Sequence, residues 1–136
     1  LLQSVHMKKG YIVNIAAEAV TNTDYRRVLY TAEHSQLVVM SIEPGDEIGE
    51  EVHGLDQFIV VQEGIAKVVL NKTEEHDLTD GHAVVIPSGS FHNVINTGDV
   101  TLKLYTIYTP PEHKDGLVQA TKADEAEVHF DGVTTE

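Results

Sequence analysis

A chain of 136 residues is long enough for one domain with a single hydrophobic core. Its formal net charge of −13 would repel the phosphate backbone of nucleic acid, so we expect no nucleic-acid partner. The absence of cysteine excludes disulfides and thiolate metal ligands, and we expect a cytoplasmic protein. No long apolar run follows Met7, so the sequence predicts neither a signal peptide nor a membrane span.

The first 27 residues are predicted to lie outside the main fold. Residues 1–6 resemble an expression-tag remnant, and Met7 is the expected native start. Residues 7–27 are predicted to form an N-terminal arm, in which Lys8 to Thr23 holds a strand followed by a short helix.

Residues 28–110 contain short β-branched and apolar runs separated by turn residues, a pattern typical of an all-β barrel or sandwich. Strands are predicted at residues 28–33, 36–43, 58–61, 65–71, 76–78, 83–86, 91–95 and 100–108, with a polar hairpin tip at residues 71–75. In the fourth of these runs Lys67 is polar, so its neighbours Ala66, Val68 and Leu70 are predicted to point inward.

The C-terminal tail, residues 111–136, is acidic and polar, with a short helix predicted from Lys122 to Glu127. It either wraps the barrel or is partly loose.

Three runs, Leu37–Met40, Phe58–Val61 and Ala83–Ile86, are apolar throughout and show no alternation. A small barrel whose outer face meets water should alternate, so these runs predict cover on the outer face as well. A second subunit or the N-terminal arm could supply that cover, and we expect a homodimer.

Two stretches carry candidate metal-binding side chains beside short apolar runs. In residues 45–64, three candidates share the same strand parity, so an extended backbone would point them to one face. They are Glu51, His53 and Gln57. In residues 81–96 the candidate is His92, on a strand expected to lie alongside.

These stretches resemble the two motifs of the cupin superfamily. The first motif is a Gly, five residues, His-x-His, three or four residues, Glu, six residues and Gly; the matching positions are Gly45, His53 and Gly64. The second is a Gly, five residues, Pro-x-Gly, two residues, His, three residues and Asn; the matching positions are Gly81, Pro87, Gly89, His92 and Asn96. Glu51 stands where the first His is usual, and Gln57 stands where the Glu is usual.

The resemblance covers roughly residues 30–108 and is to small single-domain cupins of the type described as like mannose-6-phosphate isomerase. It implies an all-β jelly-roll barrel at residues 28–110, with the arm before it and the tail after it. It also implies one divalent transition metal ion, Zn, Fe, Mn or Ni, in the barrel. The implied metal ligands are Glu51, His53, Gln57 and His92.

Each implied ligand has an alternative. The two histidines could belong to a barrel that has lost its metal, and Glu51 could belong to a solvated acidic run with Glu47 and Glu50. Gln57 is a neutral donor that could bind the metal, orient a ligand or contact substrate.

The remaining candidates have weaker signals. Asn96 matches the motif and also suits a turn cap, and His113 lies in a loop that could fold over the barrel mouth. Candidates for a pocket wall or for core packing are Tyr30, Phe91, Tyr105 and Tyr108. The histidines interpreted as surface or hairpin residues are His34, His76, His82 and His129.

Three functions fit this pattern. The first is a small metalloenzyme whose metal is a Lewis acid toward a sugar, sugar phosphate or keto acid, as in an isomerase. The second is an Fe(II)-dependent dioxygenase, because two histidines and a carboxylate can form a facial triad. The third is a non-catalytic module that holds a metal or small ligand. An enzyme needs a proton-transfer or redox partner beside the metal, and the sequence does not reveal one.

Overall fold

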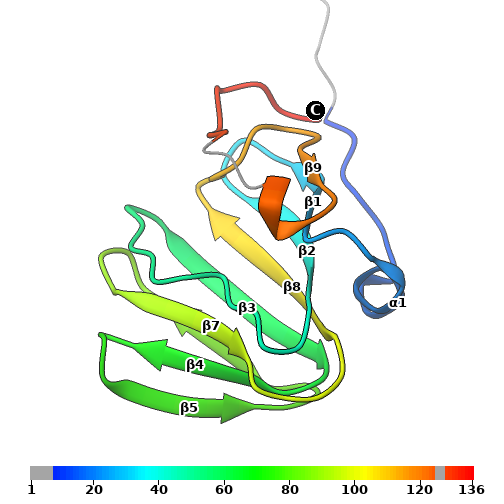
Figure 1. Ribbon diagram of the computed structural model, residues 1–136. Helices are drawn as coiled ribbons and strands as arrows, with labels where there is room; N and C mark the ends of the chain where they lie inside the picture. The colour runs from blue at the N-terminus through cyan, green and yellow to red at the C-terminus, as the bar shows by residue number, and fades with distance from the viewer. Residues whose placement is uncertain (1–7, 125–127) are drawn as a thin grey trace, which may run out of the picture.

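The computed structural model describes residues 8–124 and 128–136, so the predicted tag remnant and Met7 lie outside the described residues. The chain forms two antiparallel sheets that face each other (Figure 1). The elements are α1 (Ile15–Thr21), β1 (Arg26–Thr31), β2 (Gln36–Ile42), β3 (Asp56–Glu63), β4 (Ala66–Leu70), β5 (Glu74–Leu78), β6 (Ala83–Ile86), β7 (His92–Asn96), β8 (Leu102–Thr109), β9 (Val118–Gln119) and the 3-10 helix η1 (Lys122–Asp124). The larger sheet has the order β6-β3-β8-β2-β1-β9, and the smaller sheet has the order β5-β4-β7. The fold is therefore all-β, as predicted.

The core lies between the two sheets and follows the alternation of the strands. In β8 the side chains of Leu102, Leu104, Thr106 and Tyr108 are buried, and the residues that alternate with them are partly exposed. In β4 the predicted inward face is confirmed, because Ala66 and Val68 are buried and Leu70 packs against the core.

The N-terminal arm covers the outer face of the larger sheet. Helix α1 starts after Asn14, whose side-chain oxygen accepts a hydrogen bond from the Ala17 amide at 3.1 Å, and it packs against β2, β3 and β8. Outward residues of those strands are accordingly buried: Val39 is 0% exposed and Val60 is 8% exposed. The predicted strand before the helix is wrong, because residues 8–14 form no strand.

The prediction of cover on both faces fails for Ala83–Ile86. These residues form β6, an edge strand of the larger sheet, and Val85 is 64% exposed. A continuous apolar run is therefore a reliable sign of burial only for strands inside the sheet.

The described part of the tail lies along the barrel. Strand β9, which the sequence did not reveal, pairs with β1 at the edge of the larger sheet. Near the C-terminus, Thr135 N donates to Thr31 O at 2.9 Å. The predicted helix at residues 122–127 is a single 3-10 turn at Lys122–Asp124, and residues 125–127 lie outside the described residues. Within the described residues, no helix has the length and apolar character needed to cross a membrane.

Gly64 makes the turn between β3 and β4 with φ +97°, a conformation that side-chain-bearing residues rarely adopt. A Cβ atom there would lie 3.2 Å from Leu102 Cα and 3.2 Å from the Thr101 carbonyl oxygen. The turn therefore needs glycine for both its backbone angle and its close approach to β8.

The hairpin tip predicted at residues 71–75, between β4 and β5, is shorter than expected, because β5 already begins at Glu74.

Candidate metal centre

Three of the four predicted ligands come together at the open end of the barrel. Glu51 and His53 lie on the segment between β2 and β3, and His92 is the first residue of β7. The backbones of Glu51 and His92 pair directly, with N–H···O distances of 2.8 and 2.9 Å. One ligand atom from each of the three side chains lies within 4.8 Å of the others. The two motif stretches therefore lie side by side, as the sequence predicted.

The orientation of the His92 ring is fixed by a hydrogen bond to its own loop. The residue is 3% exposed, and Nδ1 donates a hydrogen bond to the Ser90 carbonyl oxygen at 3.0 Å. That bond places the proton on Nδ1 and leaves Nε2 with a lone pair. Among the described residues Nε2 has no hydrogen-bond partner, although it is buried. A buried, unpaired acceptor is costly, and a metal ion would satisfy it.

His53 lies between two carboxylates. Its Nε2 is 3.4 Å from Glu51 Oε2, and its Nδ1 is 3.9 Å from Glu112 Oε2. The ring centroid is 5.2 Å from that of His92. Burial lowers the pKa of His53, although the nearby Glu112 carboxylate acts in the opposite direction. Neutral imidazole is the form that binds metal, so the environment favours the ligand state.

Gln57 projects from β3 into the barrel and is 4% exposed. Its Nε2 donates to Thr106 Oγ1 at 3.1 Å, and its Oε1 is buried without a hydrogen-bond partner among the described residues. The amide oxygen is therefore the atom that this side chain can offer to a ligand. The donor set of two imidazoles, a carboxylate and an amide oxygen, two of them with unsatisfied buried acceptors, fits a divalent transition metal.

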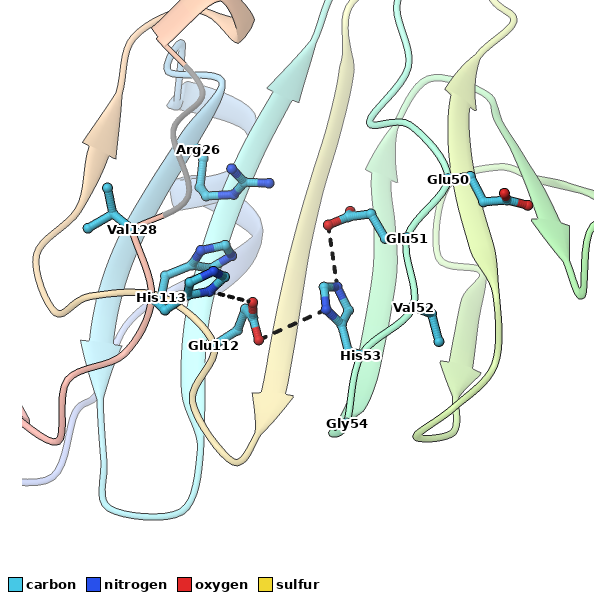
Figure 2. Close-up of a pocket in the computed structure, with 10 residues that line it drawn as sticks. Arg26, Glu50, Glu51, Val52, His53, Gly54, Glu112, His113 and Val128 are labelled. Carbon is cyan, nitrogen blue, oxygen red and sulfur yellow. Dashed lines mark hydrogen bonds and ion pairs between the residues drawn. The ribbon is translucent and has the colours of Figure 1, made fainter.

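A cavity of about 500 Å³ opens beside Glu51 and His53 (Figure 2). Most of its wall is polar or charged. The lining residues are Arg26, Glu50, Glu51, Val52, His53, Gly54, Glu112, His113, Val128 and His129. Such a wall suits a small ligand rich in hydrogen-bonding groups rather than an apolar one.

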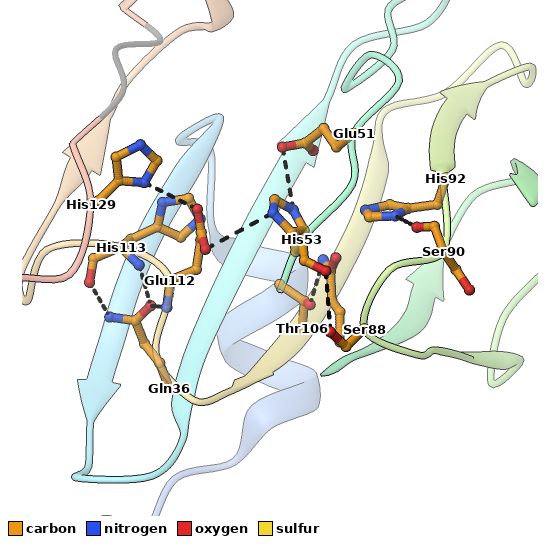
Figure 3. A network of polar contacts seen from close by, with 11 residues as sticks. Gln36, Glu51, His53, Ser88, Ser90, His92, Thr106, Glu112, His113 and His129 are labelled. Atoms are coloured by element: carbon orange, nitrogen blue, oxygen red, sulfur yellow. Dashed lines mark hydrogen bonds and ion pairs between the residues drawn. The ribbon is translucent and has the colours of Figure 1, made fainter. Parts of the chain in front are cut away.

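The tail supplies the wall opposite His53, and this contribution was largely missed from the sequence (Figure 3). Glu112 was not a candidate, and His129 was interpreted as a surface residue. His129 is indeed exposed, with 63% of its side chain accessible, but its Nδ1 donates to Glu112 Oε1 at 3.1 Å. Both residues line the cavity. No local sequence signal separates Glu112 from the many other acidic residues.

His113 lies where the sequence analysis suggested, against the cavity. Its ring makes an edge contact with Tyr108 at 5.0 Å between centroids. Burial, together with the positive charge of Arg26, lowers the pKa of His113 to about 3. The ring is therefore neutral at ordinary pH.

Of the aromatic candidates, Tyr108 alone contacts the site residues in the described structure, at 6.2 Å between its ring centroid and that of His53. Burial raises the pKa of its hydroxyl. Tyr30 instead stacks on Tyr11, and Phe91 is exposed beneath Lys72. None of Tyr30, Phe91 and Tyr105 lines the cavity.

The remaining motif residue and histidines behave as turn and surface residues. Asn96 is a turn cap, because its Oδ1 accepts from Gly98 N at 2.9 Å. In the same way His82 Nδ1 accepts from Thr79 N at 2.9 Å. His34 and His76 are exposed.

Comparison with known proteins agrees with this geometry. The family model described as Cupin domain matches residues 38–108. Protein YrkC of Bacillus subtilis (strain 168) is 41% identical over 130 residues, which cover 91% of this chain and 70% of YrkC. The crystal structure of BH2720 from Bacillus halodurans has 43% sequence identity and a TM-score of 0.84, and the match covers 88% of this chain and 95% of that one. KdgF from Halomonas sp. shares the fold at a TM-score of 0.59 and 22% identity, with 66% of this chain and 79% of that one covered. The motif spacing, the two facing sheets and these relatives together show that the chain belongs to the cupin family.

Proposed function

We propose that this cupin binds one divalent transition metal ion through Glu51, His53 and His92, with Gln57 as a weaker fourth ligand, and acts on a small oxygen-rich molecule. The observation that carries the proposal is the convergence of three ligand side chains within 4.8 Å beside a polar cavity. When bound, the metal would act as a Lewis acid that polarises a carbonyl or hydroxyl group of the ligand.

The chain's own residues give this proposal its ligand preference. Arg26 brings a positive charge and Glu112 a carboxylate to the cavity wall. Val52 and Val128 are the apolar residues of that wall. Hydroxyl and carboxylate groups can pair with such a lining, so a sugar, sugar phosphate or keto acid is the proposed substrate class, and an isomerase-like reaction is the proposed type.

An Fe(II)-dependent dioxygenase is the second candidate, supported by the same residues. Two histidines and one carboxylate form the ligand set of a facial triad. Oxygen consumption separates the two reactions: an Fe(II)-loaded protein that converts a substrate only in air is an oxygenase. A protein that binds the metal and a small ligand but does not convert that ligand is the non-catalytic module.

Elemental analysis of protein purified without added metal is the first test, and we expect close to one metal ion per chain. Because a metal that binds the native state stabilises it by mass action, chelation should lower the melting temperature. A thermal-shift screen of sugars, sugar phosphates and keto acids on the metal-loaded protein then identifies the ligand. If no metal is found and chelation leaves the melting temperature unchanged, the metalloprotein proposal is wrong.

We also propose that the protein is a homodimer. The support is the exposed apolar surface left on the edge strand β6, where Val85 is 64% exposed.

A further inference from the structure

The carboxylate of Glu112 lies between two histidines on the cavity wall. Its Oε1 accepts a hydrogen bond from His129 Nδ1 at 3.1 Å, and its Oε2 lies 3.9 Å from His53 Nδ1 (Figure 3). The side chain is 17% exposed, so the charge is shielded from bulk water. Each oxygen of Glu112 thus faces one imidazole nitrogen.

The two ring nitrogens of His53 face different surroundings. Nε2 lies on the side of Glu51, at 3.4 Å, which is the side of the proposed ligand group. Nδ1 is then the outer nitrogen. A metal-binding imidazole generally donates its outer N–H to a carboxylate or carbonyl, which fixes both its tautomer and its ring orientation. His92 already has such support from the Ser90 carbonyl at 3.0 Å.

Glu112 is held in place by its backbone. Gln36, which is 1% exposed, accepts from Glu112 N at 3.3 Å and from His113 N at 2.9 Å, and it donates to His113 O at 2.7 Å. On the other side, Phe130 N donates to Glu112 O at 2.9 Å. The carboxylate is therefore presented to His53 by a segment that is fixed to β2 and to the end of the tail.

We propose that Glu112 is a positioning residue for His53: its carboxylate accepts a hydrogen bond from Nδ1–H and so directs Nε2 toward the metal. The inference rests on the proposed function, because it assumes that His53 is a ligand. The present distance of 3.9 Å between His53 Nδ1 and Glu112 Oε2 is too long for a hydrogen bond, and the two side chains must approach by about 1 Å to form one. The tail would then complete a metal site whose ligands all come from the barrel.

Zinc affinity of the full chain tests this inference. Glu112→Ala should weaken zinc binding by about 10- to 100-fold, the usual effect of losing an outer partner of a ligand. Glu112→Gln should fall between Ala and wild type, because the amide oxygen still accepts the hydrogen bond without the charge. Glu50→Gln is the matched control: Glu50 also lines the cavity and its variant loses the same charge, but its ion-pair partner is Lys72 at 3.8 Å. We expect the control to change affinity by less than about threefold.

Nitrogen-15 NMR of the histidines gives a second readout that a purely structural role of Glu112 would not move. In zinc-loaded wild type we expect a slowly exchanging His53 Nδ1 proton. It should be lost or exchange rapidly in Glu112→Ala, while the His92 Nδ1 proton, bonded to Ser90, stays unchanged as an internal control. If Glu112→Ala does not fold, Glu112→Gln decides, because loss of the charge must still shift the His53 resonance.

The outcomes separate the two proposals. Wild-type protein that takes up no zinc overturns the proposed metal site, and this inference with it. Wild type that binds zinc, with unchanged affinity and an unchanged His53 resonance in Glu112→Ala, overturns the positioning role alone.

Discussion

Gln57 is the candidate ligand whose chemistry differs most from that of the others. It offers a neutral amide oxygen, which is a weaker donor than carboxylate or imidazole. Its nitrogen is already engaged with Thr106, so the side chain is anchored whether or not metal is bound. We therefore expect Gln57→Ala to lower metal affinity by about 10-fold.

The three principal ligands should behave differently from Gln57. Glu51→Ala, His53→Ala and His92→Ala should each lower affinity by more than about 100-fold, since each removes a ligand rather than an outer partner. Isothermal titration calorimetry with zinc measures the metal affinity of all four variants. If Gln57→Ala loses as much affinity as Glu51→Ala, the site has four equivalent ligands and the three-ligand argument fails.

His113 makes a prediction about acid stability. Its pKa is about 3 in the folded chain against 6.5 for the ordinary group, so below pH 6.5 the unfolded chain takes up a proton that the folded chain refuses. The contribution of neutral His113 to the free energy of unfolding is fully present above pH 6.5 and is lost as the pH falls from 6.5 toward 3. In His113→Phe the free energy of unfolding should fall less steeply across that range, by at most about 1.4 kcal/mol per pH unit.

Urea unfolding of metal-free protein at a series of pH values measures this difference. His34→Gln is the control, because it removes a histidine whose side chain is 85% exposed. Parallel pH profiles for wild type and His113→Phe would contradict the prediction.

The sequence predicted that the two motif stretches lie side by side, because their spacing is fixed. Glu51, His53 and His92 do converge, although metal binding by them stays a prediction, and the inward face formed by Ala66 and Val68 is confirmed. Glu112 could not be predicted, because it is remote from His53 along the chain and lies in an acidic tail. Its proposed role depends on where Gln36 fixes that segment of the tail, which is a property of the folded chain.

At the level of elements, strand positions were predictable, and their outer cover was predicted correctly for β2 and β3 but not for β6. Apolar runs and turn residues mark a strand locally, and β2, β6 and β7 were found within a residue or so of their bounds. Whether the outer face of a strand is covered depends on its place in the sheet. Both β3 and β6 are apolar, but β3 lies inside the sheet and β6 lies at its edge. Strand β9 has two residues and no apolar pattern of its own; pairing with β1 creates it.

The turn between β3 and β4 allows a test of how much the glycine at position 64 contributes to stability. Gly64→Ala should lower the free energy of unfolding by about 2–4 kcal/mol, because its Cβ is both disfavoured at φ +97° and crowded by β8. Gly81→Ala, at φ +83° with no atom within 4 Å of the added Cβ, should lose only about 1–2 kcal/mol. Chemical denaturation of the metal-free variants compares them. Equal losses would show that the contact with β8 is unimportant.

For the whole molecule, the arm and the tail together decide which surfaces stay free. Helix α1 covers the outer face of β2 and β3, so the apolar runs in those two strands need no second subunit to cover them. The apolar run in β6 still favours a dimer, because Val85 is exposed. A contact between two copies would therefore involve that edge.

Light scattering at micromolar concentration should give twice the mass of one chain, and Val85→Glu should shift the population to monomer, because a charge on an apolar contact must be desolvated. Val133→Glu is the control, since Val133 is similarly exposed at 60% but lies on the tail. A monomer mass for the wild type contradicts the homodimer.

The wall of the cavity that carries Glu112, His113 and His129 is made from the last part of the chain, whereas Glu51, His53 and His92 lie in its middle. During synthesis the three proposed ligands therefore emerge from the ribosome well before Glu112. Under the proposed positioning role of Glu112, a nascent chain would hold a metal ion tightly only after the tail had docked against Gln36. The order of residues along the chain would then make firm metal capture a late event in the synthesis of the protein.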